Sequence, residues 1–179
     1  MSLKPYLTLK VCIFADNKVG KKLLTSKFLE YLSDEKSDTS LTLGVEFNIK
    51  DVVIDGKLIR LSVWEFCSKD RFINLWSYYL LGTHGVLLMY DITNAETLDK
   101  LTEWSELIKK NTKEGIPLLL VGNKLDLEEN RQVPKELVKR FKEENNITES
   151  MEISLQTGEN VEKMFKKLTE MIEGEKILL

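Results

Sequence analysis

The sequence predicts an α/β fold with a mainly parallel sheet covered by helices on both faces. Strand-like apolar runs alternate with amphipathic segments along all 179 residues, which is the pattern of successive βα units. Two of these runs, Gly85–Tyr90 and Pro117–Val121, are short and continuously apolar, as expected for strands buried on both faces. The length corresponds to about one domain, and no repeat or linker interrupts it. We therefore predict a single domain over residues 1–179, with flexible ends at 1–6 and 174–179.

The first half of the chain predicts three strands and two helices. Leu7–Phe14 is rich in β-forming residues, and Val19–Leu32 follows with apolar residues four apart, which favours a helix. Val45–Ile54 and Leu58–Phe66 are separated by an Asp-Gly dipeptide, which favours a hairpin turn. Arg71–Leu81 is expected to be a helix, with no clear signal at its ends.

The second half continues the same alternation. Pro134 is well placed at the start of the helix expected over Lys135–Asn145. The helix expected over Ala95–Asn111 carries its apolar residues on one face. In chain order, the expected elements are strand Gly85–Tyr90, helix Ala95–Asn111, strand Pro117–Val121, helix Lys135–Asn145, strand Met151–Ile153 and helix Val161–Ile172. Ligands of such sheets bind outside the carboxyl ends of the strands, so a site is expected in the loops that follow them.

The composition argues against several classes of function. With a net charge of −3, the chain has no basic excess for nucleic acid. Its two cysteines, Cys12 and Cys67, form no CxxC pair, which argues against a structural zinc site and favours a reducing, cytoplasmic location. His84 is the single histidine, which argues against His-based metal sites and Ser-His-Asp catalysis. We interpret Cys12, His84 and Trp104 as structural, and Cys67 as an inert thiol or a reactive thiol of a switch loop.

The sequence also carries no recognisable membrane address. No apolar run reaches the length of a signal peptide core or a membrane span. The final residues, GEKILL, contain no cysteine for prenylation, and Ser2 is not the glycine that myristoylation requires. We therefore expect no direct membrane anchor.

The loop after the first predicted strand is similar to a phosphate-binding loop. In the motif G-x-x-x-x-G-K-[ST], backbone N–H groups and the lysine hold phosphates, and the hydroxyl binds Mg²⁺. Gly20 and Lys21 fit this motif, whereas Ala15 stands at its first glycine and Lys22 at its hydroxyl residue. The alternative is an ordinary loop that leads into a helix with solvated lysines.

The loop after Pro117–Val121 contains the pattern N-K-x-D. Asp126 can accept two hydrogen bonds from a guanine base, and a mismatched base would leave its carboxylate unpaired. Asn123 and Lys124 would support the edge of the base and cover its face. The alternative is a junction rich in turn-forming residues, but its position after the phosphate-like loop favours a guanine site.

With both loops in place, the chain resembles the Ras superfamily of small GTPases, and its Rab branch in particular, from about Leu7 to Ile172. Thr42–Phe47 looks like the first Rab switch, Trp64–Phe66 like the opening of the second, and Tyr90–Thr93 like the segment after the fourth strand of the family. The resemblance implies a Ras-like P-loop fold, with a six-stranded, mostly parallel sheet and about five helices. It also implies a two-state switch driven by GTP, with Mg²⁺ as cofactor.

The sequence departs from this family at its catalytic positions. Lys22 replaces the hydroxyl residue that binds Mg²⁺, and Glu65 replaces the aspartate behind the metal. Ser68 replaces the glycine that senses the γ-phosphate, and Lys69 replaces the glutamine that orients the attacking water. A charged lysine has no acceptor for water, and Mg²⁺ requires oxygen ligands in near-ideal octahedral geometry. The resemblance therefore implies no intact catalytic residue, doubtful Mg²⁺ binding and impaired or absent hydrolysis.

Other positions of the family's nucleotide site are kept in part. Thr42 would bind Mg²⁺ if the metal were bound, Ser154 opens the last guanine loop, and Ser33 replaces an aromatic residue that stacks on the base. The residues that the resemblance assigns to nucleotide binding are Gly20, Lys21, Lys22, Thr42, Asn123, Lys124, Asp126, Ser154 and Leu155. We expect GTP or GDP to bind weakly at most.

Lys22 and Glu65 suggest a specific replacement for the metal. Their counterparts in the family lie on either side of Mg²⁺, so we hypothesise that the Lys22 ammonium takes its place and pairs with Glu65. The alternative is that both side chains point to solvent, where an ion pair contributes only about 0–1 kcal/mol. A milder version has Lys18, Lys21 and Lys22 binding phosphates without a metal.

Three aromatic residues match those that Rab proteins present to effectors. They are Phe47, Trp64 and Tyr79, and the alternative for them is plain packing on the sheet. Trp76 adds a fourth large aromatic in the helix of the second switch, and clustered exposed aromatics are preferred interface anchors. We therefore expect protein effectors or complex subunits to bind across the switches.

Three functions follow from these observations. The favoured one is a Rab-like regulatory or scaffold module in signalling or trafficking that has lost hydrolysis and is not a working enzyme. The second is a guanine-nucleotide switch with slow residual GTPase activity, and the third is a working GTPase with rearranged chemistry.

Overall fold

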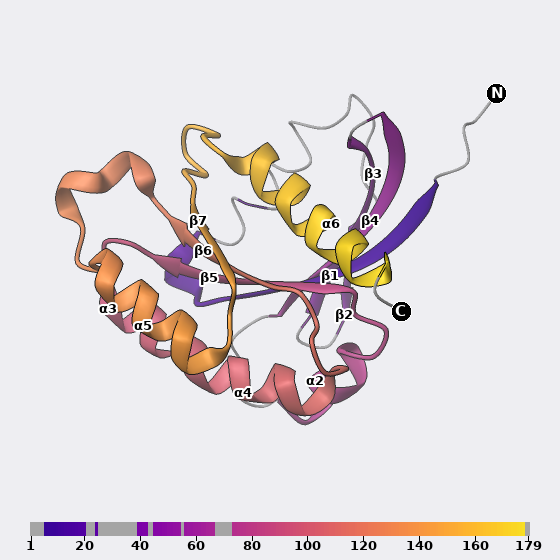
Figure 1. Ribbon diagram of the computed structural model, residues 1–179, viewed down its shortest axis with the longest axis horizontal. Helices are drawn as coiled ribbons and strands as arrows, with labels where there is room; N and C mark the ends of the chain where they lie inside the picture. The colour runs from indigo at the N-terminus through magenta and orange to yellow at the C-terminus, as the bar shows by residue number, and fades with distance from the viewer. Residues whose placement is uncertain are drawn as a thin grey trace.

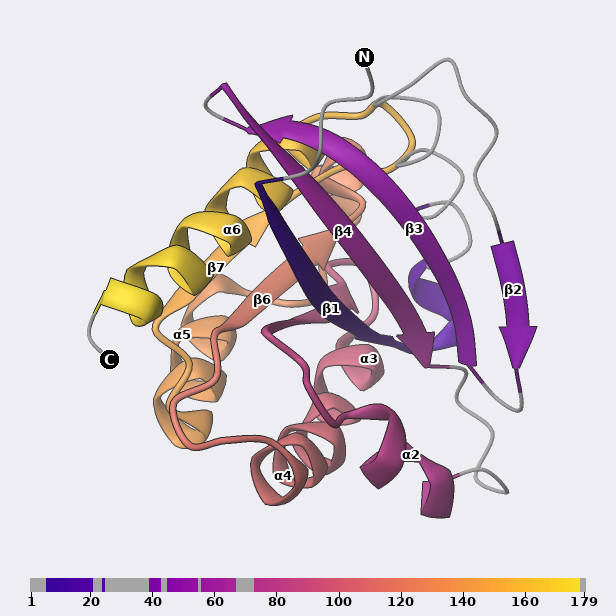
Figure 2. The same cartoon turned by 90° about the vertical axis from the view of Figure 1, so that its right-hand side faces the viewer.

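One mixed sheet forms the centre of the protein (Figures 1 and 2). The computed structural model describes residues 6–20, 24, 39–42, 45–54, 56–66 and 73–177. Within these residues the strands are β1 (Leu7–Ala15), β2 (Thr39–Thr42), β3 (Val45–Ile54), β4 (Lys57–Phe66), β5 (Gly85–Asp91), β6 (Leu118–Asn123) and β7 (Glu149–Glu152). Their order is β2-β3-β4-β1-β5-β6-β7, parallel from β4 to β7, with β3 antiparallel to β4 and β2 antiparallel to β3.

The predicted α/β fold is confirmed, and each of the six expected strands is present. The hairpin is also confirmed, because Ile54 pairs with Lys57 across a two-residue turn in which Gly56 has a φ of 78°. The short edge strand β2 was not predicted. It is four residues long and pairs only with β3, and such a short polar segment gives no apolar alternation in the sequence.

Helices cover both faces of the sheet, as predicted. Helix α6 lies on one face, and α2 to α5 lie on the other (Figure 1). The helical elements within the described residues are η1 (Asn17–Val19), α2 (Ile73–Tyr79), α3 (Ala95–Asp99), α4 (Leu101–Asn111), η3 (Leu125–Asn130), α5 (Lys135–Asn145) and α6 (Val161–Ile177). In this part of the chain, none of the helices is long and apolar enough to cross a membrane.

The helices differ from the prediction at particular boundaries. The segment expected as one helix over Ala95–Asn111 is divided at Lys100. The apolar spacing continues across this residue, so the sequence did not indicate the division. Val19 ends a 3₁₀ turn instead of opening a helix, and the amide of Leu24 donates to the carbonyl of Gly20 at 3.3 Å. Residues 25–32 of that predicted helix lie outside the described residues. Helix α6 continues to Ile177, past the expected end at Ile172.

Two apolar cores lie on opposite faces of the sheet. One lies between the sheet and α6, and the other between the sheet and the helices α2 to α5. All seven residues of β5 are buried, because the strand is central and both cores contact it. Cys12 and Trp104 belong to the second core, as their structural interpretation predicted. His84 is bound through Nδ1, which accepts from the amide of Lys10 at 3.0 Å.

Gly122→Ala is expected to lower the free energy of unfolding by about 1–3 kcal/mol, because it overpacks the second core. A Cβ at Gly122 would lie 2.7 Å from the hydroxyl oxygen of Tyr90 and 3.0 Å from a methyl carbon of Ile92. Urea denaturation followed by circular dichroism measures the change.

Gly174→Ala is the matched control for this substitution. Gly174 lies exposed in α6, and no atom lies within 4 Å of the position that a Cβ would take there. The same change should therefore stabilise the helix by about 0.5–1 kcal/mol. Equal effects of the two substitutions would contradict the crowding at Tyr90.

Candidate functional site

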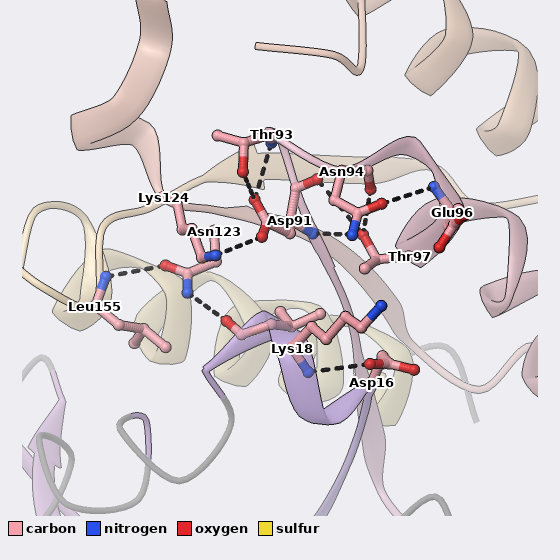
Figure 3. Close-up of polar contacts among 11 residues, drawn as sticks. Asp16, Lys18, Asp91, Thr93, Asn94, Glu96, Thr97, Asn123, Lys124 and Leu155 are labelled. Carbon is pink, nitrogen blue, oxygen red and sulfur yellow. Dashed lines mark hydrogen bonds and ion pairs between the residues drawn. The ribbon is translucent and has the colours of Figure 1, made fainter. Parts of the chain in front are cut away.

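The loops after β1, β5, β6 and β7 meet at the carboxyl edge of the sheet (Figure 3). This is the edge where open α/β sheets bind ligands. The phosphate-like loop follows β1 and the N-K-x-D segment follows β6, so the fold brings together the two motifs that the sequence singled out.

The phosphate-like loop is held in shape by side chains of the protein. Asp16 accepts a hydrogen bond from the amide of Lys18 at 3.0 Å and forms an ion pair with Lys100 at 2.7 Å. Burial alone would raise the pKa of Asp16, but the hydrogen bonds from Lys100 and Lys18 outweigh it and lower the pKa. Gly20 has a φ of 89°, a left-handed conformation that favours glycine. Lys21 and Lys22 lie outside the described residues.

Asn123 connects this loop to the loop after β7. Its side-chain amide donates to the carbonyl of Val19 at 2.7 Å, and its oxygen accepts from the amide of Leu155 at 3.0 Å. Asn123 is buried, so both bonds are shielded from water. The place of Asn123 at the edge of a base stays a prediction, and the structure adds that both ends of its amide join two loops.

Lys124 follows with a left-handed backbone, at a φ of 73°. Its ammonium group pairs with the buried carboxylate of Asp91 at 2.5 Å. Asp91 also accepts from the amide and the hydroxyl of Thr93, at 2.8 and 2.7 Å (Figure 3). The sequence showed Asp91 only as part of a family-like segment. Its pairing with Lys124 was not predicted, because Asp91 ends β5 whereas Lys124 follows β6.

Asp126 and Ser154 form the part of the site that faces solvent. The buried hydroxyl of Ser154 donates to a carboxylate oxygen of exposed Asp126 at 2.5 Å and accepts from the amide of Thr157 at 3.1 Å. Ser154 thereby orients a carboxylate that can accept two N–H groups. This arrangement fits the donor edge of a guanine base, as the sequence predicted for Asp126.

Comparison with known proteins shows the family. A model described as the Ras family matches residues 10–174. The chain belongs to the Ras family.

Its curated relatives include several Rab proteins. The chain is 37% identical over 169 residues to Ras-related protein Rab-4 of Dictyostelium discoideum, covering 94% of this chain and 81% of that protein. It is 36% identical over 166 residues to Ras-related protein RABD2a of Arabidopsis thaliana (92% and 79%), and 37% identical over 164 residues to Ras-related protein Rab-12 of Mus musculus (92% and 67%). The predicted Rab-like small GTPase family is thus confirmed. Members of the Ras family generally bind GTP or GDP with Mg²⁺, and Rab-like members bind protein effectors.

The catalytic positions of this Ras-family chain are described only in part. Glu65 is 1% exposed and lies near the end of β4, opposite Ile13 of β1. Thr42 ends β2 opposite Val45, and its side chain lies outside the described residues. The other catalytic positions, Ser68 and Lys69, and also Cys67 and Ser33, lie outside them too.

The residues at the magnesium position differ in type from those that the family resemblance implies. A charged lysine such as Lys22 has no lone pair for a cation, and replacing a short aspartate by Glu65 changes the donor behind it. Among the residues that the structure describes, no three His, Cys, Asp or Glu side chains are arranged to hold a metal ion.

The three expected partner-binding aromatics lie side by side, with Phe47 and Trp64 on the sheet and Tyr79 at the end of α2. The ring centroids of Phe47 and Trp64 are 5.5 Å apart, those of Trp64 and Tyr79 are 6.0 Å apart, and each residue is partly exposed. Lys10 lies beneath this group, with its ammonium nitrogen 4.1 Å from the centroid of Trp64. The same nitrogen donates to the carbonyls of Tyr79 and Leu81, at 2.6 and 2.9 Å, and so fixes the end of α2 against the indole ring.

The expectation that Trp76 adds to this surface is wrong. Trp76 is only 2% exposed and makes edge contacts with Phe14 and Phe66, at centroid distances of 5.9 and 5.6 Å. It lies on the side of α2 that packs against the sheet, which the short apolar pattern of this helix could not indicate.

Proposed function

We propose that this Ras-family protein is a regulatory or scaffold module that binds protein partners, hydrolyses GTP poorly or not at all, and binds guanine nucleotides weakly. The observation that supports it most is Glu65, a buried carboxylate at the end of β4, combined with Lys22 where relatives have a metal-binding hydroxyl. A buried carboxylate needs a cationic or hydrogen-bonding partner. In the family the counterparts of Lys22 and Glu65 lie on either side of the metal, so Lys22 is the cation that we propose for this partner.

The partner surface of this proposal consists of Phe47, Trp64 and Tyr79. Their rings form one partly exposed aromatic group, held from below by Lys10. Aromatic side chains of this kind are enriched among the residues that dominate binding energy at interfaces. We propose that cytoplasmic protein effectors or complex subunits bind here, without nucleic acid.

A slow guanine-nucleotide switch is the second candidate. It is favoured by the arrangement of Asn123, Asp126 and Ser154, which presents an oriented carboxylate at the carboxyl edge of the sheet. In this alternative the base is recognised as in relatives, and only turnover has been lost at Lys22, Ser68 and Lys69.

The nucleotide content of freshly purified protein distinguishes the two candidates. The protein is denatured and its supernatant is separated by ion-exchange chromatography. We expect less than one-tenth of a nucleotide per chain, on the order of what weak binding leaves after purification, and no thermal shift with added GTP. Stoichiometric GDP would contradict the proposed weak binding of nucleotide and would favour the slow guanine-nucleotide switch.

A further inference from the structure

A cavity of about 290 Å³ lies between α5 and the β5–β6–β7 part of the sheet. It shares no lining residue with the candidate nucleotide site. The residues that line it are Tyr90, Lys135, Val138, Lys139, Lys142, Ser150, Met151 and Glu152. Its volume is close to the lower end of small-molecule pockets, at about 300 Å³, and suits a molecule of one ring.

Tyr90 contributes a buried hydroxyl to this cavity. The residue is 1% exposed, and its ring crosses β6 at Gly122, where the absence of a side chain leaves room for it. Tyr90 pairs with Gly122 and Gly122 pairs with Glu152, so the hydroxyl extends across β6 toward β7.

This hydroxyl has a proton to donate. Burial, and then the nearby Glu152, raise the pKa of Tyr90, while Arg131 partly opposes them, so the phenol stays protonated at neutral pH. Among the described residues none forms a hydrogen bond with this hydroxyl, and Tyr90 lines the cavity, where a ligand can reach it. The cavity therefore has an unused donor in its wall.

The charge around the cavity is positive. Lys135, Lys139 and Lys142 follow one another at intervals of four and three residues, which places them on one side of α5. Glu152 is the acidic residue of the lining, and both its carboxylate oxygens accept from Arg131 at 2.8 Å. Arg131 also pairs with Glu128, so it balances the charge of Glu152 only in part.

The lysine charges are mostly left unbalanced. Lys139 lies 4.0 Å from Glu143, with both side chains largely exposed. Among the ion pairs of the described residues, none includes Lys135 or Lys142. An anion is therefore the ligand that this lining favours.

We propose that this cavity binds a small organic anion with an apolar ring. The anionic group contacts the lysines of α5 and accepts a hydrogen bond from the hydroxyl of Tyr90, and the ring packs against Val138. The site does not depend on whether the chain binds nucleotide, because neither the N-K-x-D segment nor the phosphate-like loop contributes to it.

Phenyl phosphate is the probe that tests this proposal, with inorganic phosphate and phenol as its separate halves. Each is titrated into the ¹⁵N-labelled full chain and followed by amide chemical shifts. With phenyl phosphate we expect saturable shifts at Val138, Ser150 and neighbouring amides. Inorganic phosphate and phenol should each bind about tenfold more weakly, because each lacks either the apolar or the charge-assisted part of the contact. Shifts confined to the loops around Lys18 and Lys124 would overturn the proposal.

Two substitutions separate the cavity from general surface charge. Tyr90→Phe removes one oxygen atom that bonds to no described residue, so folding should be unchanged while the dissociation constant rises about fivefold to tenfold. Lys142→Gln should weaken binding by a similar factor. Lys109→Gln on α4 makes the same change of charge at an exposed lysine away from the cavity and should leave binding unchanged. Equal binding by all three variants would overturn the proposal.

Discussion

The triple variant Lys22→Ser, Glu65→Asp, Lys69→Gln is expected to bind GTP with Mg²⁺ and to hydrolyse it at least about tenfold faster than the natural chain. The serine supplies an oxygen ligand for the metal, and the aspartate supplies a carboxylate of the family's length behind it. The glutamine can both accept from and donate to the attacking water, which a charged lysine cannot do. The variant leaves the guanine side unchanged, where Asp126 is already oriented by Ser154.

Single-turnover release of phosphate, measured with Mg²⁺ and with a chelator, tests this expectation. The faster rate should disappear when the metal is removed. It should also disappear when Asp126→Ala is added, which excludes a contaminating GTPase. A natural chain that already hydrolyses GTP at about 10⁻⁴ s⁻¹, the intrinsic rate scale of Ras proteins, would contradict the proposed loss of activity.

Lys22→Met is expected to lower the free energy of unfolding by about 3–5 kcal/mol. In the proposed ion pair Lys22 is the cation of Glu65, which is 1% exposed, so the substitution would leave a buried charge without that cation. The double variant Lys22→Met, Glu65→Leu should recover most of the loss, because it removes both charges and leaves an apolar pair. Urea denaturation of the nucleotide-free protein in chelator measures all three unfolding free energies.

Lys18→Met is the matched control for this cycle. Lys18 belongs to the same loop but is exposed, so its substitution should change stability by no more than about 0.5 kcal/mol. If Lys22→Met costs no more than this control, Lys22 points to solvent and the metal-replacing ion pair does not exist.

The sequence predicted most of the fold because its main signals are local. The apolar run of β5 and the Asp-Gly turn before Gly56 each report their structure within a few residues. The features it missed depend on contacts between distant segments. Asp16 and Lys100 are paired across the fold, and β2 exists only because β3 lies beside it.

The candidate site was predicted at the level of its motifs, but less well at the level of its bonds. Asp126 and Ser154 lie together as the family resemblance implied. The two bonds of the Asn123 amide were not predicted, since no pattern in the sequence shows that Val19 and Leu155 approach it from two loops. Trp76 was misplaced for a similar reason, because α2 is only seven residues long and too short to define an apolar face.

The amide of Asn123 also determines how this edge of the sheet can open. One buried side chain holds the loop after β1 with its donor and the loop after β7 with its acceptor. Displacing either loop breaks a shielded bond and leaves a polar atom of Asn123 unsatisfied. The two loops therefore form one cooperative opening unit, so that local unfolding at Val19 and hydrogen exchange at the Leu155 amide proceed together.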